Sequence, residues 1–340
     1  STERGELGLQ VSHLSNDDET VHLERSTVLT PTACLQQLTF TSFAQTSLQV
    51  PITLHVDADF RDIFEVRGYQ RPARGRTVRT CTPEGLEAVY HGLDNTDRCT
   101  LVRLSGPVQE VDEACLQLSL QLEPRRPRRL CVVLDFHPDG TRQPPTPEAA
   151  FDAALEAAVE RFREANRLAA SVTTDNPAFN CWIARSTSDV HLLSSQLDHG
   201  IYPYAGVPWF SCPFGRDGLI TARQLLLFEP RLARGVLGFL AEHQARHGDP
   251  ASDAEPGKVL HEARLGEMAA LGEVPFAHYY GSVDATPLFL ILAGDYLMRS
   301  GDQAFIHELR SALEAAMAWI RAAESSAADG FLRYQCAAQG

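Results

Sequence analysis

The chain has 340 residues, 44% of them hydrophobic and 22% charged, which is typical of a globular protein long enough for two domains with sizeable cores. Acidic residues outnumber basic ones by 44 to 30, and the resulting net charge of −14 disfavours binding to nucleic-acid backbones or anionic membranes. No apolar run approaches the roughly 18 residues of a membrane span, and no signal segment opens the chain, so we expect a cytoplasmic protein.

The first part of the chain, residues 1–147, has the pattern of an antiparallel β-sandwich. Apolar residues alternate with polar ones at positions 48–56 and again at 116–122, which predicts strands with one buried and one wet face. Six further strands are predicted at residues 21–29, 35–43, 60–67, 86–91, 99–104 and 130–136. About eight strands with short turns favour a sandwich.

A proline-rich connector at residues 138–147 then changes the sequence period. Phe151, Leu155, Val159 and Phe162 form one stripe of a helix, so residues 148–175 are predicted to be a linker helix and connector.

From residue 176 to 340 the pattern is that of successive helices in hairpins. Five are predicted around residues 179–190, 219–228, 232–243, 287–299 and 305–320, and a weaker one at 260–271. Glu229 and Pro230 mark the break between the second and third.

Three polar clusters fall in loops that precede alternate helices. They are Arg216 with Asp217, residues 255–262 with Arg264 and Glu267, and residues 279–284. If the helices form a closed ring, loops on one rim converge on a common pocket. Its carboxylates, arginines and aromatics would suit a neutral oligosaccharide, because a nucleotide site would want a glycine-rich loop between strand and helix.

The segment before the second predicted helix indicates how a sugar could be held. Trp209 and Phe210 offer apolar faces to a pyranose ring, while Arg216 and Asp217 supply donors and acceptors for its hydroxyls. The alternative is that the aromatics belong to the core and the charged residues form a surface ion pair at a helix start.

Hydrolysis of a glycosidic bond needs two carboxyl groups. Candidates are Glu255, Glu262, Glu267 and Asp284, with Asp284 favoured because tyrosines precede it. Each also has a structural interpretation, such as an exposed helix charge or, for Asp284, a helix cap. His261 and Glu262 begin like a zinc-binding H-E-x-x-H helix, but residue 265 is leucine. The eight cysteines include no C-x-x-C pair, so neither a metal site nor a cofactor is expected.

Five motifs carry a resemblance to a known family. They are DADFRDIFEVRG at residues 57–68, AGVPWF at 205–210, FGRD at 214–217, EPGKVLHE at 255–262 and YYGSVDATPLF at 279–289. The chain resembles bacterial and archaeal glycogen debranching enzymes of the amylo-α-1,6-glucosidase type, within the six-hairpin glycosidases. The resemblance extends over essentially all of the chain.

The resemblance implies a β-sandwich followed by an (α/α)6 barrel, and hydrolysis of α-1,6-glucosidic branch linkages of glycogen or limit dextrin with inversion. It also implies substrate contacts by the two aromatic residues of the AGVPWF motif and by residues of all three polar clusters: Trp209, Phe210, Arg216, Asp217, His261, Glu262, Tyr279, Tyr280 and Asp284. Cys212, Pro213 and Gly218 depart mildly from the family pattern.

Length is the larger departure from the family. In the family, the segment with the general acid follows the sixth helix and the base comes later, so both are expected beyond Gly340. Six helices are half of a twelve-helix ring, and we therefore expect an internal portion that is inactive alone. Two alternatives remain open, a non-catalytic glycan-binding module and a related six-hairpin α-glucosidase of other linkage specificity. The sequence does not determine the oligomeric state.

Overall fold

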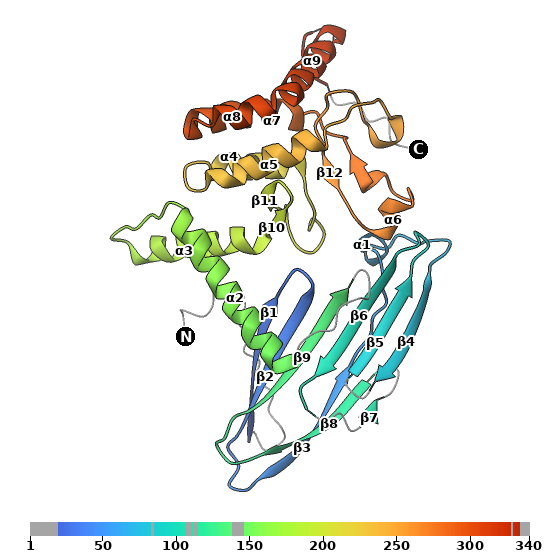
Figure 1. Cartoon of the computed structure of the whole chain (residues 1–340), viewed down its shortest axis with the longest axis vertical. Helices are drawn as coiled ribbons and strands as arrows, with labels where there is room; N and C mark the ends of the chain where they lie inside the picture. The colour runs from blue at the N-terminus through green and yellow to red at the C-terminus, as the bar shows by residue number, and fades with distance from the viewer. Residues whose placement is uncertain are drawn as a thin grey trace. The chain divides into compact units, whose positions relative to one another are not determined.

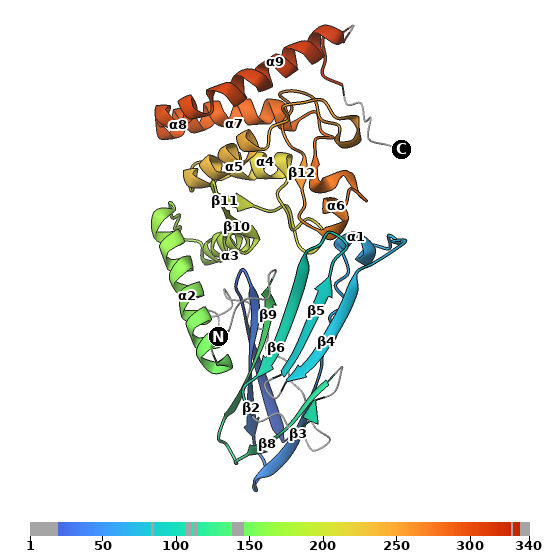
Figure 2. The same ribbon diagram turned by 45° about the vertical axis from the view of Figure 1, so that its right-hand side comes forward.

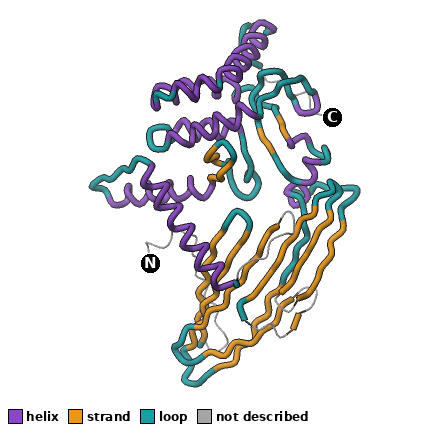
Figure 3. Tube along the Cα trace, viewed as in Figure 1, coloured by secondary structure: helices purple, strands orange, loops and turns teal. Residues whose placement is uncertain are grey.

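The computed structural model of the chain describes residues 20–82, 85–106, 110–111, 115–137, 146–327 and 329–333. The chain divides into two compact units, Ser1–Glu164 and Ala165–Gly340, so the boundary falls inside the linker helix. Strands make up most of the first unit and helices most of the second (Figure 3). Most of the proline-rich connector, residues 138–145, lies outside the described residues.

The first unit is built on two antiparallel sheets (Figure 1). The larger sheet has the strand order β1 (Val21–Leu29), β2 (Ala33–Ser42), β9 (Arg128–His137), β6 (Asp97–Leu104), β5 (Gly85–His91) and β4 (Arg76–Thr82). The smaller sheet has the order β3 (Leu48–His55), β8 (Cys115–Leu122) and β7 (Glu110–Val111). Alternate residues of β8, Leu116, Leu118, Leu120 and Leu122, are buried in a core that both sheets share, which confirms the predicted sandwich.

The outer face of the larger sheet is covered by α2 (Pro147–Leu168), the predicted linker helix (Figure 2). Phe151 is 2% exposed and packs with Leu35 of β2 and Val133 of β9. The stripe of apolar residues that predicted this helix therefore seals a second, smaller core.

The predicted strand at residues 60–67 is wrong. A single helical turn, α1 (Ile63–Val66), occurs there instead, because Asp62 and Glu65 form a reciprocal capping box at its start. Phe60, with a φ of 48°, turns the chain just before it and stacks on Tyr90 at 5.5 Å between ring centroids.

The second unit contains paired helices around one core (Figures 1 and 2). They are α3 (Pro177–Leu193), α4 (Gly215–Gln224), α5 (Pro230–Glu242), α7 (Ala285–Ser300), α8 (Gln303–Glu308) and α9 (Arg310–Ser326). A hairpin of β10 (Ser194–Leu197) and β11 (Gly200–Pro203), absent from the sequence prediction, follows α3. Among the described residues, none of the helices is both long and apolar enough to cross a membrane.

Helices α4 and α7 lie side by side and run in the same direction. Arg216 at the start of α4 pairs with Asp284, just before α7, at 3.2 Å, and Arg223 near the end of α4 pairs with Asp295 at 2.6 Å. Helix α5 packs against both and runs the opposite way, since the carbonyl of His243 at its end accepts a hydrogen bond from Tyr280, near the start of α7. This up-down-up order places the loops before α4 and α7 at one end of the unit.

The predicted helix at residues 260–271 is largely wrong. The chain is extended at β12 (Glu262–Ala263), which pairs with β13 (His278–Tyr279), and only the short α6 (Glu267–Ala270) is helical. Backbone hydrogen bonds to neighbouring segments on both sides of β12 outweigh the apolar spacing. The last predicted helix is divided at Leu309 into α8 and α9.

Candidate functional site

The structure brings the three polar clusters together at the start of α4 and α7. The backbone N–H of Gly215 donates to the carbonyl of His261 at 2.8 Å, and the N–H of His261 donates to the carbonyl of Tyr279 at 2.7 Å. Residues from all three loops thus lie on adjacent, hydrogen-bonded strands of chain.

The glycine that opens α4 is required by this close approach. A Cβ on Gly215 would overlap the carbonyl oxygen of Leu260. Gly218, one turn later, is covered by the ring of Tyr202, whose hydroxyl would lie 2.7 Å from an added Cβ and donates to the carbonyl of Phe214 at 2.9 Å. Two glycines therefore let the first turn of α4 pack against its neighbours and fix the positions of Arg216 and Asp217.

Arg216 and Asp284 form the central charged contact of the site. Nη1 of Arg216 donates to Oδ2 of Asp284 at 3.2 Å, and both side chains are almost half exposed. Asp284 occupies the N-cap position of α7, but its side chain makes no capping hydrogen bond to the helix. Its other oxygen, Oδ1, is buried and has no hydrogen-bond partner among the described residues. The hydrogen-bonding capacity of this oxygen is therefore unused within the described residues.

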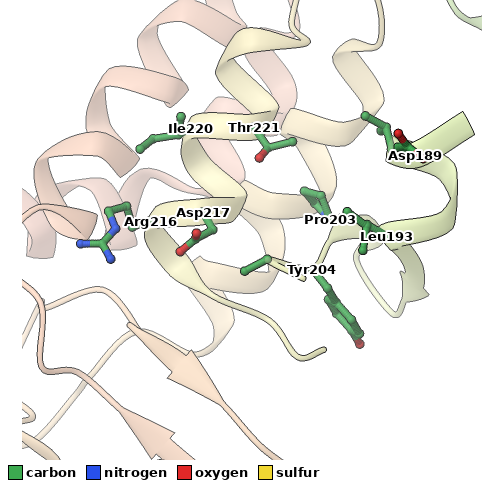
Figure 4. Close-up of a pocket in the computed structure, with 10 residues that line it drawn as sticks. Asp189, Leu193, Pro203, Tyr204, Arg216, Asp217, Ile220 and Thr221 are labelled. Carbon is green, nitrogen blue, oxygen red and sulfur yellow. The ribbon is translucent and has the colours of Figure 1, made fainter. Parts of the chain in front are cut away.

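Asp217 faces a hollow of about 320 Å³ between α4 and the end of α3 (Figure 4). Its lining residues come from α3, the β11–α4 connection and α4: Asp189, Val190, Leu193, Pro203, Tyr204, Ala205, Arg216, Asp217, Ile220 and Thr221. Apolar walls with a few carboxylate, guanidinium and hydroxyl groups suit a neutral polyol. Trp209 and Phe210 are exposed but do not line this hollow.

His261 lies behind the charged pair. Its ring contacts Phe214 and Tyr279 edge to face, at 5.5 and 5.9 Å, and its Nδ1 is buried without a hydrogen-bond partner among the described residues. Burial lowers the pKa of His261; the nearby Arg216 lowers it further, while Glu262, Asp284 and Asp217 oppose the shift. At neutral pH the ring is uncharged and can offer one nitrogen as donor or acceptor.

Both tyrosines of the third cluster use their hydroxyls inside the protein. Tyr279 donates to Asp253 at 2.9 Å, and Tyr280 donates to the carbonyl of His243 at 2.8 Å. Tyr280 is only 8% exposed, and burial raises its pKa. The structure therefore gives Tyr280 a role in holding the loop before α7.

Glu262 is buried and supports the aromatic loop indirectly. Its Oε1 accepts from Nε of Arg264 at 3.0 Å, and Nη2 of the same arginine donates to the carbonyl of Trp209 at 3.1 Å. Within that loop, Gly206 and Phe210 exchange two backbone hydrogen bonds. The Glu262–Arg264 pair thus positions the turn that displays Trp209.

The other carboxylate candidates are engaged elsewhere. Glu255 accepts from the indole of Trp319 at 2.9 Å and contacts the buried ammonium of Lys258 at 3.4 Å, which ties its loop to α9. Glu267 is 5% exposed at the start of α6. Within the described parts of the chain, no three His, Cys, Asp or Glu side chains are grouped closely enough to hold a metal ion.

Sequence reasoning missed the residues that α3 and β11 contribute to the hollow, notably Asp189 and Tyr204. Tyr204 directly precedes the AGVPWF motif and could have been included on that ground. Nothing in the sequence distinguishes Asp189, which is i+4 from Arg185 and paired with it at 2.8 Å, from an ordinary helix charge.

Comparison with known proteins was informative for both halves of the chain. Residues 4–133 match the family described as the N-terminal domain of some glycogen debranching enzymes. Comparison with curated protein sequences gave no match. A structure described as a kojibiose phosphorylase from the human microbiome superposes with a TM-score of 0.52 and 12% identity, covering 87% of this chain and 44% of the other. An inverting mannosidase of family GH92 from Bacteroides thetaiotaomicron gives a TM-score of 0.33 and 10% identity, covering 84% and 40%.

The chain therefore shares the overall fold of the first of these structures, with an antiparallel β-sandwich followed by a helical domain. It spans less than half the length of either solved structure. The match of residues 4–133 to the N-terminal domain of some glycogen debranching enzymes agrees with the resemblance drawn from the motif at residues 57–68.

Proposed function

We propose that the protein is a glycoside hydrolase of the glycogen-debranching type, acting on α-1,6-glucosidic branch linkages with inversion, and that the start of α4 and α7 holds the sugar. The observation that carries this proposal is the junction of Arg216, Asp217, His261 and Asp284 beside the hollow. The match of residues 4–133 to the N-terminal domain of some glycogen debranching enzymes supports a branched α-glucan as the substrate. We also propose three parts of the chain: a β-sandwich domain at residues 1–147, a linker helix and connector at 148–175, and part of an (α/α)6 barrel at 176–340.

Asp284 and Asp217 are proposed to accept hydrogen bonds from sugar hydroxyls, and Arg216 to donate to them. Charged hydrogen bonds of this kind contribute about 1.5–3 kcal/mol each when made in a site closed to water. Trp209, displayed on its turn, would cover an apolar sugar face. Glu262 would act through Arg264 on that turn, and the buried Tyr280 through the loop it anchors.

The experiment compares two carboxylates of α7 that make the same kind of ion pair. Asp284 pairs with Arg216 at the proposed site, and Asp295 pairs with Arg223 further along the same helices. Glucose release from a branched dextrin is measured for the full-length protein and for its Asp284→Asn and Asp295→Asn variants, because the 340-residue chain is expected to be inactive alone. We expect Asp284→Asn to lower kcat/KM by about 10-fold to 100-fold and Asp295→Asn to leave it near the parent value. Equal effects of both substitutions would contradict the site.

Linkage is tested with a panel of α-1,6, α-1,4 and α,α-1,1 linked glucosides. The proposal predicts preference for the α-1,6 linkage and initial release of the β anomer, because inversion changes the configuration at the reacting carbon. Preference for another linkage would assign the site to a different α-glucosidase. Binding of these sugars without turnover would instead support a glycan-binding module.

A further inference from the structure

An exposed aromatic pair stands on α3, close to the hollow. Phe179 and Trp182 contact each other with ring centroids 5.5 Å apart, and they are 40% and 60% exposed. None of the residues of α3 is buried, so the helix presents its side chains along much of its circumference. Large exposed aromatics that touch one another are typical of binding surfaces.

The face of α3 that carries Trp182 leads to the hollow. Residues seven and eleven positions apart lie within about 20° of one line on an α-helix, which places Trp182, Asp189 and Leu193 in one row. Asp189 and Leu193 line the hollow together with Asp217 of α4 (Figure 4). At ~1.5 Å per residue, Trp182 is about 10 Å along the helix from Asp189.

A charged pair, Arg185 with Asp189, lies between the aromatic pair and the hollow. Arg185 pairs with Asp189 through two contacts, Nη2 to Oδ1 at 2.8 Å and Nε to Oδ2 at 3.1 Å. Both side chains are about half exposed or more, so their remaining donors and lone pairs can reach hydroxyl groups. This face of α3 therefore carries an apolar aromatic pair followed by hydrogen-bonding groups, and adjacent sugar rings can contact both.

We propose that the face of α3 that carries Phe179, Trp182, Arg185 and Asp189 is an extension of the sugar site, which binds further glucosyl units of an α-glucan chain whose end occupies the hollow. The inference rests on the proposed function and adds a chain-length specificity to it. The net charge of −14 disfavours an anionic polysaccharide, whereas a neutral glucan meets no repulsion.

Continuity with the hollow favours a glucan chain as the occupant of this face. The exposed aromatics could also contact a helix of another protein. The face ends in a charged pair at the hollow, however, and this matches a polar sugar chain better than an apolar helix. The experiment separates the two occupants.

The test measures binding of maltose and maltoheptaose to the protein and to Trp182→Ala, Trp182→Phe and Met298→Ala. Met298 is the matched control, because it is 80% exposed on α7 and does not line the hollow. We expect Trp182→Ala to weaken maltoheptaose binding about tenfold and to leave maltose binding unchanged. Trp182→Phe should retain most of the affinity for the longer sugar, and Met298→Ala all of it.

Several results would overturn the inference. Equal maltoheptaose affinity in the protein and Trp182→Ala, with maltose still bound, would remove the extension and leave the proposed function intact. A change of sedimentation coefficient in Trp182→Ala without a change in length preference would show that the face packs against protein. Failure of the unaltered protein to bind either sugar would overturn both proposals.

Discussion

Adjacent residues at the start of α4 have different surroundings. Arg216 is held by Asp284, whereas the side chain of Asp217 has no hydrogen bond among the described residues and faces the hollow. Its carboxylate is therefore free to accept from a ligand. We predict that Asp217→Asn in the full-length protein lowers kcat/KM for a branched dextrin, with a loss of about 1.5–3 kcal/mol of transition-state stabilisation, because the charged acceptor is lost while the side-chain shape is kept.

The control for this variant is Asp198→Asn, which alters an exposed carboxylate in the β10–β11 turn. Both variants should unfold at the temperature of the parent protein, since neither carboxylate supports the fold through a hydrogen bond. An unchanged kcat/KM for Asp217→Asn, measured beside the control, would remove Asp217 from the site.

Three partly desolvated histidines make stability depend on pH. Partial desolvation lowers the pKa of His191, His261 and His278 below the ordinary value of 6.5, and for His278 the stacked His243, with centroids 5.2 Å apart, lowers it further. A depressed pKa means that the unfolded chain binds the proton more tightly. Their stability contribution is therefore complete above about pH 6.5 and is lost as the pH falls from there through the lowered pKa values.

We predict that the melting temperature of the protein falls between pH 7.5 and 5, and that His278→Phe makes this fall shallower. Phenylalanine keeps the ring stacked on His243 but cannot be protonated. Thermal unfolding followed by circular dichroism at each pH would measure the difference. A steeper fall for the variant would show that His278 is not a source of the pH dependence.

At the scale of single elements, α4 depends on its first residue. Gly215→Ala would place a methyl group on the carbonyl oxygen of Leu260, and we predict a loss of about 1–3 kcal/mol of unfolding free energy. Gly294 in the exposed interior of α7 has nothing within 4 Å of an added Cβ. Gly294→Ala should therefore stabilise the protein by about 0.5–1 kcal/mol. Urea unfolding of both variants measures these changes, and equal effects of the two would refute the packing argument.

Elements whose side chains face a single environment were predictable from sequence. The alternation in β3 and β8 predicts strands because one face of each borders the core, and the stripe on α2 predicts a helix because it seals a sheet. The edge strand β4 carries mostly exposed Arg and Thr residues and gave no such signal. In α1, a local capping box decided the conformation against the apolar spacing.

The site was predictable only in part, for a similar reason. The polar clusters before α4 and α7 were visible as motifs, and the parallel course of these helices brings Arg216 to Asp284. The motifs did not show which polar groups form hydrogen bonds inside the protein. The partners of Tyr279, Tyr280 and Glu255 are distant in the sequence. Glu262 pairs with the nearby Arg264, but its burial depends on the fold and not on a motif.

At the scale of the whole molecule, the chain has separate cores in its two units. Leu118 is 3% exposed within the sandwich core, and Leu237 is 0% exposed in the core of the helical unit. We predict that calorimetry resolves two unfolding transitions. Leu118→Ala should lower the unfolding free energy of the first unit, and Leu237→Ala that of the second unit. Each loss should be about 2–5 kcal/mol, because replacing a buried leucine by alanine leaves a cavity.

Whether the two transitions shift independently decides whether the two units unfold separately. If each substitution moves only its own transition, the sandwich is a self-standing domain, and loss of sugar binding in a helical-unit variant can be assigned to that unit alone. If both substitutions lower a single shared transition, the units fold as one cooperative body. The sugar site at the start of α4 and α7 would then depend on the sandwich for its stability, and substitutions in the β core should weaken glucan binding in proportion to the folded population they remove.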